Sequence, residues 1–201
     1  MKRSLLSAAV LAFLATIIGC HPTASFLNVP LTYSPSNGGN GGSFTLPNTK
    51  VYVAQIVDQR SNTTEIGENH QNEKPIPIYA EDTKPPEFLR KVMIEDFRND
   101  GLNVVDSADD ADRVVNITLQ RFWVTETDTY DAQVTLIVQV TDKSGNVLAS
   151  NMVARGESST FGRTLSPENY QQVLSDATDQ AISYLLKNED FLKAISAGKG
   201  E

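Results

Sequence analysis

Three neighbouring segments between residues 114 and 158 alternate apolar and polar side chains, and this pattern constrains the fold more than any other feature. Side chains of a β-strand point alternately to the two faces of a sheet, so the pattern predicts three long strands with one buried face each. Residues 142–146, Asp-Lys-Ser-Gly-Asn, predict a tight hairpin turn between the last two strands. The alternating residues of the first two strands are Val115, Ile117, Leu119 and Trp123, then Ala132, Val134, Leu136, Val138 and Val140.

Two helices and two further strands are expected around these segments. Residues 50–57 are apolar on both faces, which predicts a buried strand. One helix is expected to begin at Pro85-Pro86 and to end before Gly101, with a short strand after it, and another to begin at Ser166-Pro167. The predicted fold class is α+β: a single domain with a mixed, mostly antiparallel sheet of about five strands and two main helices packed on one face.

The first twenty residues have the layout of a secretory signal. Lys2 and Arg3 precede an apolar stretch that ends in Ile17-Ile18-Gly19-Cys20. This ending resembles a bacterial lipobox, which implies cleavage after residue 19 and lipidation of Cys20. Two other interpretations remain open: a buried helix, and an ordinary cleaved signal followed by a cysteine present by chance. Lipidation is favoured because Cys20 is the only cysteine and lies where apolar sequence gives way to polar sequence.

The residue after the cysteine bears on location. In the sorting pattern of enteric-type bacteria, Asp at this position retains a lipoprotein at the inner membrane. His21 occupies it here, so the resemblance implies the outer membrane, with the protein lipid-anchored on the periplasmic face.

The chain is therefore predicted to have three parts: a lipoprotein signal peptide at 1–19, a lipidated N-terminus with a flexible tether at 20–47, and a periplasmic α+β domain at 48–197. The tether prediction rests on a run rich in Gly, Ser and Asn before residue 44. The alternative is that residues 27–33, which alternate apolar and polar side chains, add to the sheet as an edge strand.

Charge and composition exclude several classes of partner. The chain carries 25 acidic and 17 basic residues, and removal of Lys2 and Arg3 with the signal leaves a net charge of −10. Nucleic-acid binding requires a basic surface, so no nucleic-acid partner is expected. With one cysteine no intramolecular disulfide can form.

No catalytic or metal-binding motif stands out, so no enzyme activity, cofactor or metal is expected. The two histidines, His21 and His70, lie beside the anchor and in a polar segment, without the sequence context of a Ser-His-acid triad. They cannot supply the ligands of a structural zinc site. The acidic residues of 106–112 lack the glycine and distal glutamate of a calcium loop. A hydrolase that uses only a pair of carboxylates is kept as the weakest alternative.

The segment 58–83 shows no periodicity and is the candidate interaction loop, because long structureless loops are often functional. Its candidate residues are Asp58, Arg60, Ile66 and Gly67. The competing interpretation is structural: Asp58 and Arg60 fix the turn after the strand, and Gly67 provides a bend. Trp123 has a similar ambiguity between a core residue and an exposed interface anchor.

The lipobox, the strand that ends in Val57-Asp58-Gln59-Arg60, the pair Ile66-Gly67 and the helix that ends in Gly-Leu-Asn-Val resemble the YajG-like family of uncharacterised bacterial outer-membrane lipoproteins. The resemblance covers residues 20 to about 190 and implies an outer-membrane lipoprotein without established enzyme activity. The expected function is a non-catalytic, lipid-anchored periplasmic binding or scaffold module that docks an envelope protein or polymer. The alternative is an accessory subunit of an envelope transport or assembly complex that pairs by strand addition at a sheet edge or at the 58–83 loop.

Overall fold

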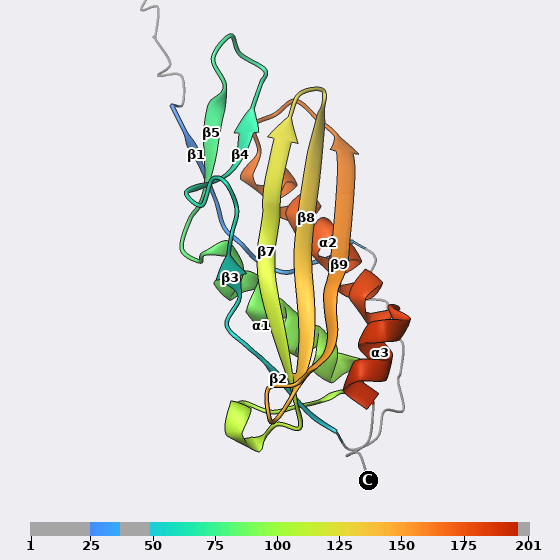
Figure 1. The fold of residues 1–201 in the computed structure, drawn as a ribbon. Coiled ribbons are helices and arrows are strands. Elements are labelled where there is room, and N and C mark those ends of the chain that lie inside the picture. Colours follow the sequence, from blue (N-terminus) through green and yellow to red (C-terminus); the bar gives the residue numbers. More distant parts are fainter. Residues whose placement is uncertain (1–24, 37–48, 197–201) are drawn as a thin grey trace, which may run out of the picture.

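The computed structural model describes residues 25–36 and 49–196, which form one α+β domain (Figure 1). The described helices are α1 (Pro85–Asn99), α2 (Pro167–Leu186) and α3 (Glu189–Ser196). The described strands are β1 (Leu27–Val29), β2 (Lys50–Val53), β3 (Val57–Asp58), β4 (Glu65–Asn69), β5 (Ile76–Ala80), β6 (Asn103–Val104), β7 (Arg113–Glu126), β8 (Thr129–Asp142) and β9 (Val147–Phe161).

Strand β7 is the axis of the sheet. β8 pairs antiparallel along one side of it, and β9 pairs antiparallel with β8. Along the other side, β2, β3 and β4 pair parallel with the start, middle and end of β7. β5 lies antiparallel to β4, β1 is parallel to β5, and β6 is parallel to β2. Three short strands, β2, β3 and β4, thus pair one after another along the same edge of β7 before the chain reaches β5 and α1.

The prediction of a single α+β domain is confirmed, but the predicted sheet is wrong in two respects. The described sheet has nine strands rather than about five, and five of its eight strand pairs are parallel, so it is not mostly antiparallel. The four extra strands, β1, β3, β4 and β5, have two to five residues each. Runs this short carry no readable alternation, so the segment 58–83 looked like a loop although it contains β4 and β5.

The helix boundaries agree with the signals in the sequence. Pro85 and Pro86 occupy the first positions of α1, where a missing N–H costs nothing, and Gly101 follows the helix with a φ of 90°. Ser166 caps α2, and its hydroxyl accepts a hydrogen bond from the backbone N–H of Asn169. α3 continues the chain after α2, so the described helices number three rather than two.

One hydrophobic core lies between the helices and the inner face of the sheet. The Phe88 ring of α1 packs edge-on against Phe122 of β7, with centroids 6.1 Å apart. The Phe97 ring contacts Phe191 of α3 at 5.7 Å, which ties α1 to the C-terminal helix. All four side chains are buried, and the helices lie behind the sheet in Figure 1, so its other face carries no helix among the described residues. We call this second face the outer face.

A β-bulge in β7 determines which side chains reach the core. The pairing with β8 skips one residue between Leu119 and Arg121, so the alternation of β7 changes phase there. Phe122 and Glu126 consequently point inward, and Trp123 lies on the outer face, partly buried. The prediction that Trp123 shares the inner face with Leu119 is therefore wrong.

Residues 25–36 pack on the domain, although the predicted tether included them. β1 pairs with β5 at the edge of the sheet. This agrees with the alternative interpretation, in which residues 27–33 add to the sheet as an edge strand, for the three residues of β1. After β1, the chain crosses to the helices, where the Ser34 N–H donates to Ser175 Oγ at 2.7 Å and the Ser36 N–H to Asp176 Oδ1 at 2.6 Å. We call residues 30–36 the strap. Cys20 and the signal peptide lie outside the described residues, as does the rest of the predicted tether.

Candidate functional site

Asp58 and Arg60 form a buried ion pair that organises the turn after β3. Arg60 Nε and Nη2 donate to the two carboxylate oxygens of Asp58 at 2.9 and 2.8 Å, and the Arg60 side chain is 4% exposed. The guanidinium also donates to the backbone carbonyls of Thr63 and Glu65, both at 3.0 Å. Burial opposes ionisation of Asp58, but the hydrogen bonds from Arg60 lower its pKa below the ordinary value. The pair thus has the structural role that the competing interpretation gave it.

The other two candidate residues of this segment lie inside the sheet. Ile66 is fully buried in the core. A Cβ on Gly67 would lie 2.2 Å from the backbone oxygen of Val124, so Gly67 permits the close approach of β4 to β7 rather than a bend. The structure therefore does not bring Asp58, Arg60, Ile66 and Gly67 together on one exposed surface.

The outer face carries a different group of residues. One cross-strand row joins Trp123, Gln133 and Glu157, and the next toward the β8–β9 turn joins Arg121, Thr135 and Arg155. A hollow of about 490 Å³ lies against Trp123 and Arg121. Its further lining residues are Thr125, Asp131, Ala132, Gln133, Glu157, Ser158 and Ser159.

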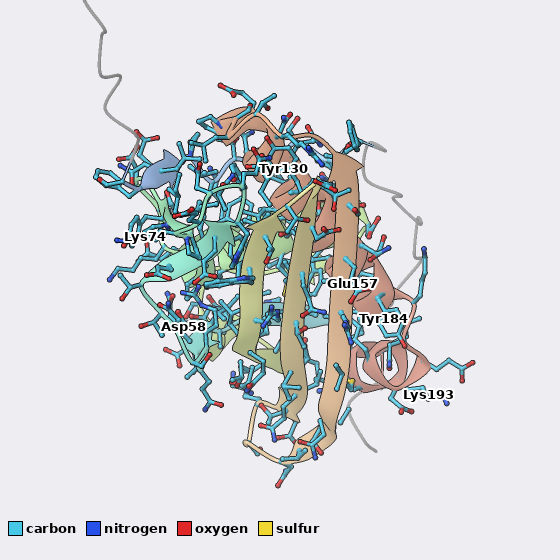
Figure 2. All side chains as sticks on the ribbon, turned by 90° about the horizontal axis from the view of Figure 1, so that it is seen from above. Asp58, Lys74, Tyr130, Glu157, Tyr184 and Lys193 are labelled. Carbon is cyan, nitrogen blue, oxygen red and sulfur yellow. The ribbon has the colours of Figure 1, made fainter. Side chains whose placement is uncertain are left out.

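An apolar row lies beside this hollow on the same face. Val57 of β3 pairs with Thr118, which pairs with Ile137, which in turn pairs with Val153 of β9. Val57 and Val153, at the two ends of this row, are 54% and 49% exposed, so the row is open to solvent. Figure 2 shows how far this face extends: Asp58, which follows Val57, and Glu157 lie on opposite sides of β7. We call the Trp123 hollow together with this apolar row the outer-face patch.

Two carboxylates, Glu157 and Asp131, line the hollow, and Glu157 lacks the raised pKa of a glycosidase general acid. Such catalysis needs a general acid with a raised pKa. Hydrogen bonds from Gln133 and then from Arg155 lower the pKa of Glu157 instead. Asp131 accepts hydrogen bonds from Ser159 and Thr129 at 2.6 and 2.5 Å. Glu157 is also more than half exposed, so water is not excluded from it.

A buried polar cluster lies on the inner side of the sheet at the end of β7. The Glu126 carboxylate is fully buried and accepts hydrogen bonds from Asn69 Nδ2 at 2.6 Å, from Gln71 Nε2 at 2.7 Å and from the Tyr170 hydroxyl. The backbone N–H of Leu165 also donates to it, at 3.3 Å. Burial and, to a smaller extent, the hydrogen bond to Glu126 raise the pKa of Tyr170, so its hydroxyl stays protonated. The cluster joins β4, β7 and the start of α2.

A second carboxylate cluster fastens the strap to the helices. Tyr33 Oη lies 2.8 Å from Asp96 Oδ2 of α1 and 3.0 Å from Asp179 Oδ1 of α2. Burial raises the pKa of Asp96 to about 6, and the charge of Asp179 adds to this while the Tyr33 hydrogen bond opposes it. A hydroxyl has one proton, so both contacts are satisfied when Asp96 is protonated and donates to Tyr33 Oη.

Sequence reasoning missed both clusters, and also the outer-face patch. Glu126 and Asp96 belong to elements that were expected, but nothing in a single sequence shows which acidic residue is buried. The sequence does contain a pattern that indicates the inward position of Phe122. The apolar alternation of Val115, Ile117 and Leu119 shifts by one residue and continues at Phe122 and Val124.

Over residues 25–36 and 49–196 the structure shows no group of three or more metal-ligating side chains. His70 lies at the surface, where its ring contacts Glu68 at 2.9 Å. Within the same residues no helix has the length and apolar character needed to cross a membrane.

Comparison with solved structures shows the fold. Protein XCC0632 from Xanthomonas campestris, of the DUF330 family, is similar at a TM-score of 0.54 and 14% identity, over 79% of this chain and 89% of that one. The hypothetical protein CT253 from Chlamydia trachomatis is similar at a TM-score of 0.50 and 10% identity, over 75% and 99% of the two chains. The PelC dodecamer from Paraburkholderia phytofirmans is less similar, at a TM-score of 0.44 and 14% identity, over 72% and 92%.

At these identities the likeness extends to the fold and assigns no activity. No protein-family model matches the sequence, and no curated protein matches it. The class defined by fold is thus a small α+β domain shared with a DUF330 protein.

Proposed function

We propose that this protein is a lipid-anchored, non-catalytic binding module of the bacterial envelope, held at the periplasmic face of the outer membrane by Cys20. It docks an envelope protein or polymer on the outer-face patch. The observation that carries the docking proposal is the patch itself: a sheet face that no helix of the described residues covers, with Trp123 beside a hollow and exposed valines in a row. The anchor rests on the lipobox, as does the resemblance to the YajG-like family.

The chemistry of the patch fits a binding role. Partly exposed tryptophan and arginine side chains are the residue types most often found to dominate binding energy at interfaces. Gln133, Asp131 and Glu157 surround Trp123 with hydrogen-bonding groups that can orient a partner. The pKa of Glu157 is lowered, so this group does not have the raised pKa of a general acid, which favours a binding role over that chemistry.

Photo-crosslinking in cells tests the docking proposal. A photoreactive amino acid replaces Trp123 in one variant and Ser144, in the β8–β9 turn, in a control variant. We expect a discrete crosslinked product at position 123 and none at position 144. A band of added mass that is sensitive to protease identifies a protein partner, and a smear that resists protease identifies a polymer. Absence of any product at position 123, with the variant folded and membrane-bound, would contradict the proposal.

The second candidate is an accessory subunit that pairs by strand addition, and one observation favours it. β9 has 15 residues and, within the described chain, pairs with β8 alone. The edge formed by β1 offers less, because β1 has only three residues. The β9 edge is itself partly occupied, because Gln180 Oε1 of α2 accepts a hydrogen bond from the backbone N–H of Glu157 at 2.6 Å. This N–H is not free to pair with an added strand. Recovery of a defined complex by crosslinks along β9, rather than at Trp123, would favour this candidate.

A further inference from the structure

The connection between the lipid anchor and the folded domain is short. Four residues separate Cys20 from Ser25, the first residue that the structure describes. Even a fully extended chain spans only about 3.5 Å per residue, so Ser25 lies within about 18 Å of the lipidated cysteine. β1 begins two residues later and pairs with β5. The membrane must therefore lie near the end of the sheet at which β1 begins.

The register of the sheet identifies what else lies at this end. Asn69, the last residue of β4, pairs with Glu126, the last residue of β7. Thr129, the first residue of β8, pairs with Phe161, the last residue of β9. The start of β1, the β4–β5 turn, the β7–β8 turn and the end of β9 thus share one end, which is uppermost in Figure 1. We call it the anchor end.

Two exposed phenylalanines flank the anchor end. Phe26 directly precedes β1 and is 52% exposed, with its ring edge-on to Tyr79 at 6.1 Å. Phe161 is 81% exposed, more than any other large apolar side chain among the described residues. Five strand spacings separate their strands, which places the two rings about 24 Å apart. Aromatic side chains with exposed rings are typical anchors at the boundary between headgroups and acyl chains.

We propose that the anchor end rests on the lipid surface, with the rings of Phe26 and Phe161 inserted at the headgroup boundary. This inference relies on the lipid anchor of the proposed function. β7 rises by about 44 Å over its length, so in this orientation the β8–β9 turn projects far from the membrane. The outer-face patch then stands upright, with its rows parallel to the membrane and open to partners in the periplasm.

Charge does not drive this contact. Lys74 and Arg163 lie near the anchor end, but Glu73 is adjacent to Lys74 in sequence and Asp128 forms an ion pair with Arg163. Glu68 and Asp131, which the register also places near this end, add further negative charge. Attraction to anionic headgroups is therefore weak, and the contact depends on the acyl chains and the two rings. Its salt dependence should be small.

Depth-dependent quenching tests the orientation. The intact lipidated protein is reconstituted into phosphatidylethanolamine–phosphatidylglycerol vesicles with nitroxide-labelled lipid. Because lipidation consumes the Cys20 thiol, a single introduced cysteine can carry the fluorophore: Asn72→Cys in the β4–β5 turn, or Ser144→Cys in the β8–β9 turn as the control. We expect strong quenching and a blue-shifted emission at position 72 and neither at position 144. Equal responses at the two positions would overturn the proposal.

Removing the rings separates their role from that of the tether. In the Asn72→Cys protein, Phe26→Ser with Phe161→Ser should clearly weaken the quenching and remove the blue shift, while the short connection still keeps the protein on floating vesicles. The matched control, Val147→Ser with Leu148→Ser, changes two exposed apolar residues at the other end and should leave the quenching unchanged. Unchanged quenching in the phenylalanine variant would refute insertion of the rings. Failure of the parent protein to float would instead refute the lipid anchor.

Discussion

Tyr33 connects three parts of the molecule through a single hydroxyl group. It belongs to the strap, and its two partners, Asp96 and Asp179, lie on α1 and α2. Burial and the two neighbouring carboxylates raise the pKa of Tyr33, so the hydroxyl stays a donor at every physiological pH. Asp96, by contrast, titrates near pH 6. The protonation state of one carboxyl group therefore affects how firmly the strap is held.

Stability should fall as the pH rises through the pKa of Asp96. The folded protein raises this pKa from 3.8 to about 6, so the stabilising proton is fully present below pH 3.8 and is lost above pH 6. Asp96→Asn keeps the contact with Tyr33 without the charge. At pH 7.5 it should be more stable than the wild type by about 1–2 kcal/mol, a value reduced for partial solvent screening.

Urea unfolding at pH 4 and at pH 7.5 measures the difference. The advantage of Asp96→Asn should shrink strongly at pH 4, and Asp110→Asn, at an exposed position, should show no such pH dependence. A stability gain of Asp96→Asn that is equal at both pH values would contradict the assignment.

Glu126 is the other residue on which the fold depends. Glu126→Ala removes the buried acceptor of the Tyr170 hydroxyl and one of the two acceptors of Asn69 Nδ2, while the exposed Gln71 keeps the backbone oxygen of Thr127. A buried donor without a partner costs about 1–3 kcal/mol, so a loss of about 2 kcal/mol or more is expected in denaturant unfolding. Glu157→Ala, on the exposed face of the same sheet, should change stability much less. A small effect of Glu126→Ala would show that water replaces the carboxylate.

Among the elements, the contact between β9 and α2 depends on one glycine. A Cβ on Gly156 would lie 1.8 Å from the backbone oxygen of Ala177 and 2.6 Å from the backbone nitrogen of Ala181. These are backbone atoms, so the helix itself would have to move. Gly156→Ala should destabilise the protein by about 2–4 kcal/mol, and Thr160→Ala, at an exposed position of the same strand, by much less. Thermal unfolding of both variants checks this, and equal shifts in melting temperature would contradict it.

Elements with strong local signals could be predicted from the sequence, and those set by tertiary contacts could not. Pro85, Gly101 and Ser166 mark helix ends through local backbone chemistry, so α1 and α2 were expected where they lie. β3 has two residues and exists because β7 offers it a partner. The bulge before Arg121 also arises from pairing, and it reversed the expected position of Trp123.

On the scale of the whole molecule, the strap and β1 change how the domain is attached. A tether of 27 residues would let the domain move freely about 30 Å from the lipid, as expected for a flexible chain of that length. Because residues 25–36 pack on the domain, only the residues up to 24 remain to link it to Cys20. With the proposed lipid anchor at Cys20, a domain held this closely would present one end to the membrane, which the sequence alone did not indicate.

Palmitate labelling of the wild type and of Cys20→Ala, followed by membrane fractionation, tests the central claim most directly. We expect label on the wild type alone, in the outer-membrane fraction, and accumulation of the unprocessed precursor when globomycin inhibits the lipoprotein signal peptidase. The variant should carry no label. An unlabelled wild-type protein, or one released in soluble form, would contradict the lipid anchor and with it the proposed orientation.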